Sequence, residues 1–317
     1  MLHNLIQLIL AFLFAPLLSG VVINAKASWQ GFPGLPITQV YRDIVNHYRH
    51  MVAAPVHGSS VGIYTSLLIF AAVGTAVFYV PLYAGAPLGC SGDIFIVMYL
   101  LAMTRVFTTL QKWDGSSDFG SKDHGRDLPV GTLIEPVLAI SLLAMAIPKG
   151  SAGLTDVLMH LQNNGLAGFS FSHWLTLAAI CALMVAEISR MATDNPYAHL
   201  EPAGQEHERI SRQISGWPLA LVTWSHSVKQ LLLCSIIANL VLPWHPFWLG
   251  IWPAGGFAEI GVGMWLAGMV LFCLKILVFG LILAAFETFG SKKLFLKPNY
   301  LLGVAVISGM AGNIISI

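Results

Sequence analysis

Ionisable residues inside long apolar runs are the residues of this sequence that could do chemistry. Charged residues make up only 10% of the chain, yet Lys229 and Lys275 lie in stretches that are otherwise almost entirely apolar. A charge at the centre of a membrane helix costs about 2.5–3.5 kcal/mol on insertion scales, so it usually pairs with another group or marks an ion path. The pattern therefore predicts either buried ion pairs or a proton relay, and it leaves both open. The six residues concerned are Arg105, Glu135, Glu187, Lys229, Lys275 and Glu287.

The cysteines show no spacing that is typical of a metal site. All four are far apart in the sequence, and none forms a Cys-x-x-Cys or Cys/His pair. Their expected role is that of small buried apolar residues. The sequence also lacks a P-loop, a nucleophile elbow and a Gly-x-Gly-x-x-Gly motif. We expect this chain to bind no metal or cofactor and to catalyse no reaction alone.

Membrane helices are the elements predicted to position the ionisable residues. Hydrophobic residues make up 56% of the chain, the mean hydropathy is +0.74, and the apolar runs reach the roughly 20 residues that cross a bilayer. We predict an all-α polytopic membrane protein with about eight transmembrane helices, forming a single integral membrane domain over residues 1–317. The expected spans cover residues 3–25, 60–85, 92–111, 128–148, 171–192, 218–243, 262–287 and 298–316.

An amphipathic segment follows the first span. Pro33 and Pro36 break any helix before it. From Thr38 onward, apolar residues recur at helical spacing while charged and amide residues occupy the other face. The pattern predicts a helix over residues 38–51 that lies in the membrane interface, although an ordinary surface helix would show the same pattern.

The distribution of basic residues predicts the orientation of the spans. The loops after spans 1, 3, 5 and 7, with their flanks, hold twelve of the sixteen Lys and Arg residues, whereas the opposite side holds only Lys149. The positive-inside rule then places these odd-numbered loops in the cytoplasm and both termini outside a prokaryotic inner membrane. The net charge is only +1 and no basic patch is extended, so lipid is an expected partner and nucleic acid is not. The twelve residues are Lys26, Arg42, Arg49, Lys112, Lys122, Arg126, Arg190, Arg209, Arg212, Lys292, Lys293 and Lys297.

Five short motifs occur in the order found in one family of membrane subunits. They are "GLPITQVYRDI", "RDLPVGTLIEP", the polar stretch that begins "EISRMATD", "SGWPLALVTWSHSVKQL" and "LKILVFGLILAAFE". Over essentially its whole length the chain resembles the heel subunit of respiratory complex I and its counterparts in formate hydrogenlyase and group 4 membrane-bound hydrogenases. Asp127 stands in place of a glutamate of the family pattern. The matched residues are Gly34, Pro36, Gln39, Tyr41, Arg42, Asp43, Ile44, Arg126, Glu135, Pro136, Glu187, Arg190, Asp194, Glu201, Ser215, Gly216, Trp224, Ser227, Lys229, Lys275, Phe286 and Glu287.

The resemblance implies a membrane subunit that anchors a redox complex and couples it to ion movement. We expect the group 4 hydrogenase or formate hydrogenlyase type, in which iron–sulfur clusters and a NiFe-type centre belong to partner subunits. Those partners would be hydrogenase-like large and small subunits, an iron–sulfur subunit and antiporter-like membrane subunits. The alternatives are the quinone-site heel subunit of complex I and, from a different class, a stand-alone ion transporter. The docking residues implied are Gly34, Pro36, Gln39, Tyr41, Arg42, Asp43, Arg126 and Asp127.

The polar stretch departs from the family pattern in its acidic residues. Tyr197 and His199 stand where the family has glutamates. A histidine, with an ordinary pKa near 6.5, can exchange protons at neutral pH, whereas a tyrosine titrates near 10. We expect proton entry through His199 with Glu187 and Glu135, and no quinone-type cavity; the alternative is a loop that only packs against a partner. The proton-path candidates are Glu135, Glu187, Asp194, His199, Glu201, Lys229, Lys275 and Glu287.

Overall fold

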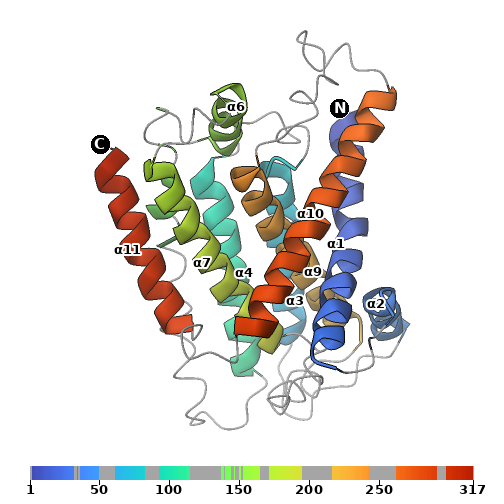
Figure 1. Cartoon of the computed structure of the whole chain (residues 1–317). Helices are drawn as coiled ribbons and strands as arrows, with labels where there is room; N and C mark the ends of the chain where they lie inside the picture. The colour runs from blue at the N-terminus through green and yellow to red at the C-terminus, as the bar shows by residue number, and fades with distance from the viewer. Residues whose placement is uncertain are drawn as a thin grey trace.

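The described part of the chain is built from α-helices. A computed structural model describes residues 2–31, 34, 36–49, 61–82, 93–114, 137–138, 140–143, 146, 150, 153–164, 171–194, 216–242, 262–290 and 298–316. Over these residues the only extended pairing is an isolated bridge between Asp93 and Gly153, so the all-α prediction is confirmed. The helices, shown in Figure 1, are α1 (Leu2–Trp29), α2 (Gln39–Arg49), α3 (Val61–Tyr79), α4 (Ile94–Asp114), α6 (Leu154–Asn164), α7 (Phe171–Asp194), α9 (Trp217–Val241), α10 (Val262–Gly290) and α11 (Pro298–Ser316).

Five of these helices are long and apolar enough to cross a membrane, which makes the chain a multi-pass membrane protein. They lie in α1, α3, α4, α9 and α10. The apolar parts of α7 and α11 are shorter, at Phe171–Leu183 and Gly303–Gly312. Of the predicted span 128–148, only residues 137–138, 140–143 and 146 are described, and they are helical. The count of eight therefore stays a prediction.

The predicted span over residues 60–85 extends beyond the end of the helix in the structure. The span expected over residues 60–85 is a helix only as far as Tyr79, and residues 80–82 are not helical. Pro81 explains the early stop, because proline has no N–H to donate within a helix and disfavours the helical conformation of the residue before it.

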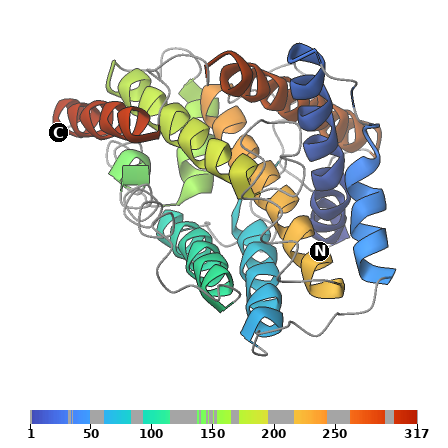
Figure 2. The ribbon, with the colours of Figure 1, turned by 90° about the horizontal axis from the view of Figure 1, so that it is seen from below.

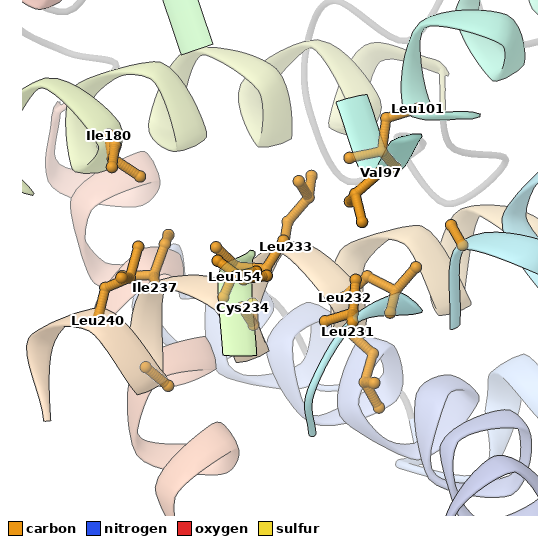
Figure 3. Close-up of a cluster of buried hydrophobic side chains, with 14 of the residues drawn as sticks. Val97, Leu101, Leu154, Ile180, Leu231, Leu232, Leu233, Cys234, Ile237 and Leu240 are labelled. Carbon is orange, nitrogen blue, oxygen red and sulfur yellow. The ribbon is translucent and has the colours of Figure 1, made fainter. Parts of the chain in front are cut away.

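Helix α9 is the centre of the bundle. Eighteen of its 25 residues are buried, as expected for a helix that is apolar on every side. Figure 3 shows its side chains in one buried cluster with Val97 and Leu101 of α4, Leu154 of α6 and Ile180 of α7. Any residue on α9 is therefore held by neighbours on several sides.

Helices α7 and α11 pack closely through small residues. The Ser172 hydroxyl donates to the Gly312 carbonyl over 2.7 Å. A Cβ added at Gly312 would come within 2.5 Å of the Thr176 methyl, and one at Gly309 within 2.8 Å of the Ser141 hydroxyl. Gly312 thus lets the backbones of α7 and α11 approach, as is common between membrane helices, and Gly309 leaves room for Ser141, which lies on neither helix.

The two ends of the bundle carry different short helices. Figure 1 shows both chain termini and α6 at one end, and α2 beside the C-terminal end of α1 at the other. Figure 2, from below, shows α2 alongside α1 at the edge of the bundle. The predicted helix over residues 38–51 is thus confirmed as α2, whereas α6 was not predicted, since its 11 residues mix apolar and polar types and are too few to span a bilayer.

Candidate functional site

Lys275, near the middle of α10, makes hydrogen bonds to the end of α9. It lies inside the apolar segment Gly268–Phe286, where water is not available to solvate an ammonium group. Its Nζ donates a hydrogen bond to Asn239 Oδ1 over 3.0 Å and another to the backbone carbonyl of Leu242. Both acceptors belong to the end of α9, so the cation of one helix is held by the terminus of another.

Asn239 extends this contact to a third helix. Its side-chain Nδ2 donates to the carbonyl of Pro81 over 3.0 Å and to that of Leu82 over 2.9 Å. Both carbonyls lie just after the end of α3. The ends of α3 and α9 therefore meet the middle of α10 at one polar cluster, formed by Lys275, Asn239, Leu242, Pro81 and Leu82. Non-helical backbone at membrane depth is tolerated only where protein buries it or a cavity adjoins it.

The electrostatics of this polar cluster favour a cation. The C-terminal end of a helix carries a partial negative charge and leaves its last carbonyls without intrahelical donors. The Leu242 N–H closes the final turn of α9 on the Ala238 carbonyl at 3.0 Å, and the Leu242 carbonyl, just beyond the end of the helix, accepts from Lys275. A lysine placed here can hold a proton against a helix end and release it, which is the chemistry that a relay needs.

Lys229 and Glu287 lie away from the polar cluster along their helices. Lys229 is buried on α9, ten residues before Asn239, which is about 15 Å along a helix axis. Glu287 is twelve residues beyond Lys275 on α10, or about 18 Å. Glu187 and Asp194 lie in the C-terminal part of α7, with Asp194 its last residue. The structure therefore does not bring Lys229 or Glu287 into one group with Lys275. Five candidates lie outside the described residues. They are the proton-path candidates Glu135, His199 and Glu201 and the docking candidates Arg126 and Asp127.

Helix α2 carries four of the predicted docking residues, Gln39, Tyr41, Arg42 and Asp43. Gln39 Nε2 donates to Asp43 Oδ1 over 2.9 Å, and Arg42 donates to the Thr38 hydroxyl over 3.2 Å. The second oxygen of Asp43 is buried and has no hydrogen-bond partner among the described residues. Arg42 is exposed and Asp43 is half-buried, so α2 carries a carboxylate held by Gln39 next to an exposed guanidinium that bonds to Thr38.

The segment before α2 is seated against α1 through glycines. A Cβ at Gly20 would overlap the backbone carbonyl oxygen of Ile37, and one at Gly34 would overlap the Asn24 side chain. The Pro36 carbonyl accepts the Gln39 N–H at 2.8 Å and so starts α2 directly after this seat. Gly34 and Pro36 thus have a clear internal role, which is to hold α2 in place.

Pro16 interrupts the backbone hydrogen bonding of α1, and two distant side chains compensate. Proline lacks an N–H, so the Phe12 carbonyl loses its helical donor. Trp224 Nε1 donates to this carbonyl over 3.1 Å, and the Tyr41 hydroxyl donates to the next carbonyl, that of Leu13. Burial raises the pKa of Tyr41 above its ordinary value, which keeps the phenol protonated as a donor.

An aromatic cluster surrounds the Trp224 contact. The Trp224 ring lies 6.1 Å from that of Phe12, nearly perpendicular to it, and 5.8 Å from that of Phe70. Such arrangements contribute about 0.5–1.5 kcal/mol per pair beyond the burial of the rings. Tyr41 and Trp224, two residues of the matched motifs, therefore join α2 and α9 to the proline-interrupted part of α1.

Several polar residues of the bundle were missed by the analysis of charges. The Ser19 hydroxyl donates to Gln230 between α1 and α9 at 2.8 Å, and Gln111 donates to Ser66 between α4 and α3 at 2.7 Å. Asn239 belongs to the same class. Gln111, Gln230 and Asn239 are neutral amides, and Ser19 and Ser66 are hydroxyl residues. An amide within an apolar run is the pattern that could have indicated Gln230 and Asn239.

Comparison with known proteins identifies a family whose model matches this chain. Residues 4–292 match a family model described as NADH dehydrogenase. Two relatives come from Escherichia coli strain K12. Formate hydrogenlyase subunit 4 is 28% identical over 290 residues, which are 90% of this chain and 89% of that protein. Hydrogenase-4 component C is 27% identical over 275 residues, which are 86% of this chain and 82% of that protein.

A solved structure shares the fold over the whole chain. It is a chain in the membrane-bound sulfane sulfur reductase, an archaeal respiratory membrane complex. The TM-score is 0.74, the identity 16%, and the match covers 100% of this chain and 99% of the other. At this identity the likeness concerns the fold alone.

Proposed function

Because the chain belongs to the NADH dehydrogenase family, we propose that it is a membrane subunit of an energy-converting redox complex of the hydrogenase type. The observation that carries the proposal is the similarity, over nearly the full length of both chains, to formate hydrogenlyase subunit 4 and hydrogenase-4 component C. These two names also favour the hydrogenase type over the quinone-site subunit of complex I.

In this proposal the redox groups belong to other subunits. Iron–sulfur clusters and a NiFe-type centre lie on hydrogenase-like large and small subunits and an iron–sulfur subunit, and antiporter-like subunits lie beside this chain in the membrane. The chain itself anchors the peripheral subunits and carries part of the ion path. Lys275 is the best-supported member of that path, because its ammonium is held at the meeting point of three helices.

The rest of the path is assigned from the sequence. Protons enter through His199 with Glu187 and Glu135, and Asp194, Glu201, Lys229 and Glu287 are further candidates. No quinone-type cavity is proposed, since half of the acidic residues of the family pattern are replaced in the stretch that contains His199.

Helix α2 and the loops on its side form the proposed docking surface for the peripheral subunits. We predict that Asp43→Lys lowers the amount of large subunit that co-purifies with this chain about tenfold or more. A partner surface that accepts the Asp43 carboxylate would face the lysine with a like positive charge, which is strongly unfavourable at an interface. The measurement is affinity purification of a tagged chain from detergent-solubilised membranes, followed by identification and quantification of its partners.

Two variants control this experiment. Asp43→Asn keeps the size of the side chain and an acceptor for Gln39, so partner loss in that variant traces to the charge. Asp156→Lys makes the same reversal on α6, at the opposite end of the molecule, and should leave co-purification unchanged. If Asp43→Lys binds its partners normally, α2 is not the docking element. If the unmodified chain purifies without any hydrogenase-like subunit, the proposed function is wrong.

The proposed sidedness follows from the basic residues. The loops near residues 26–58, 112–127, 193–217 and 288–297 face the cytoplasm of a prokaryotic cell, and both termini face outside. In a Cys90→Ser background, we predict that a cysteine at Lys149 reacts with a membrane-impermeant maleimide on intact cells, whereas one at Lys122 reacts only after the cells are opened. The reverse pattern would invert the topology and remove α2 from the side on which a cytoplasmic partner could dock.

A further inference from the structure

We infer that Asn239 is the residue that positions the Lys275 ammonium for ion coupling, an inference that rests on the proposed role of Lys275 in the ion path. Asn239 lies in the last turn of α9, and the charge pattern of the sequence did not indicate it. Its side chain contacts α10 through one end and the segment after α3 through the other. It is the one described side chain that accepts a hydrogen bond from Lys275.

Only one orientation of the amide satisfies all of these contacts. The carbonyls of Pro81 and Leu82 can accept hydrogen bonds but cannot donate them, so they require the NH₂ end of the amide. Both hydrogens of that end are then occupied. The amide oxygen is therefore directed at Lys275, 3.0 Å from Nζ, and cannot turn away without leaving two carbonyls unpaired.

The surroundings of Asn239 hold it rigidly. Its neighbours on α9, Ile236, Ile237, Ala238 and Leu240, are all buried. Because the backbone position is fixed by this packing and the amide by two hydrogen bonds, the acceptor that Lys275 meets is preorganised. Groups that act on a charge contribute most when they need no rearrangement to do so.

A neutral acceptor suits a lysine that must exchange a proton. An amide oxygen binds the ammonium by one hydrogen bond and adds no opposite charge. A carboxylate at the same place would add an opposite charge to the hydrogen bond and would hold the lysine in its charged form. Asn239 thus positions the ammonium at the end of α9 and still allows the lysine to release its proton.

The test measures charge movement per electron in the assembled complex. Purified complex is reconstituted into lipid vesicles, a potential-sensitive dye reports charge translocation whichever ion moves, and reduced methyl viologen supplies electrons. We expect Asn239→Leu to assemble and to keep the redox rate in detergent. The charge moved per electron should fall about tenfold, which is the factor that corresponds to the free energy of one lost hydrogen bond to a charged group. Asn239→Asp should also assemble and also lose charge movement, because its carboxylate retains the lysine.

A matched control separates positioning from packing. Gln230→Leu removes another amide from α9, one that bonds to Ser19 and not to Lys275, and should leave the charge moved per electron unchanged. An equal loss in Gln230→Leu would show that any damage to α9 uncouples the complex, and this would overturn the inference. If Asn239→Leu keeps full coupling while Lys275→Met loses it, Asn239 is not the positioning residue and the proposed function stands. If Lys275→Met keeps full coupling, the proposed ion path through Lys275 itself is wrong.

Discussion

Replacing Lys275 by arginine should uncouple the complex as completely as replacing it by methionine. Arginine keeps the positive charge and can still donate to Asn239 and Leu242, but it cannot release a proton in a protein. If Lys275 relays protons, both variants should reduce the charge moved per electron to about a tenth or less of the unmodified value, since the path loses a member that no neighbour replaces. The redox rate in detergent should be unchanged.

The pair of substitutions also distinguishes two roles for the residue. An arginine variant that retains coupling while the methionine variant loses it would mean that Lys275 supplies only a fixed charge. Cys273→Ala, two residues away on the same helix, is the control for general damage to α10 and should keep full coupling. Methionine also leaves the Leu242 carbonyl without its donor, which costs about 1–3 kcal/mol, so assembly must be verified first.

Gly20→Ala should detach the segment that begins α2. The added Cβ would overlap a backbone oxygen, that of Ile37, which cannot move away by a simple side-chain rotation. Overpacking of this kind usually costs about 1–3 kcal/mol, although alanine favours the helix intrinsically. We expect a lower thermal unfolding midpoint in detergent, faster tryptic cleavage after Arg42 and Arg49, and loss of the peripheral subunits on purification.

Gly74→Ala is the matched control for this result. Gly74 also lies in a membrane helix, but its added Cβ would meet only the Phe12 ring at 3.5 Å, an ordinary contact distance. That variant should be as stable as the unmodified protein or slightly more so. If Gly20→Ala behaves in the same way, the contact between α1 and residue 37 does not hold α2.

The fold was predictable to the extent that it depends on local pattern. Apolar runs long enough to cross a bilayer identified α1, α3, α4, α9 and α10, and alternation of apolar and polar residues at helical spacing identified α2. Helix ends were less predictable. The end of α3 at Tyr79 depends on Pro81 outweighing an apolar run that continues past it, and α6 is too short and too mixed in composition to give a signal.

Of the residues in the candidate site, only the charged one, Lys275, could be predicted from the sequence. Lys275 was visible because a charge inside an apolar run is costly and rare. Asn239 was not, because an amide carries no net charge and its partners are 36, 157 and 158 residues away in the sequence. Gly20 is similar, since nothing in its own neighbourhood indicates that another backbone passes beside it. Residues whose role depends on tertiary contacts require a structure to identify them.

Pro16 has a consequence for the order in which the protein is made. The Phe12 carbonyl obtains its hydrogen bond from Trp224, 212 residues later in the chain. At roughly 5–20 residues per second, the ribosome needs about 10–40 s to synthesise that distance. During this time α1 would carry an unsatisfied carbonyl if it entered lipid alone, at a cost of several kcal/mol. We expect α1 to remain beside the insertion machinery until α9 arrives, so that α1 enters the bilayer only together with a residue made 212 positions later in the chain.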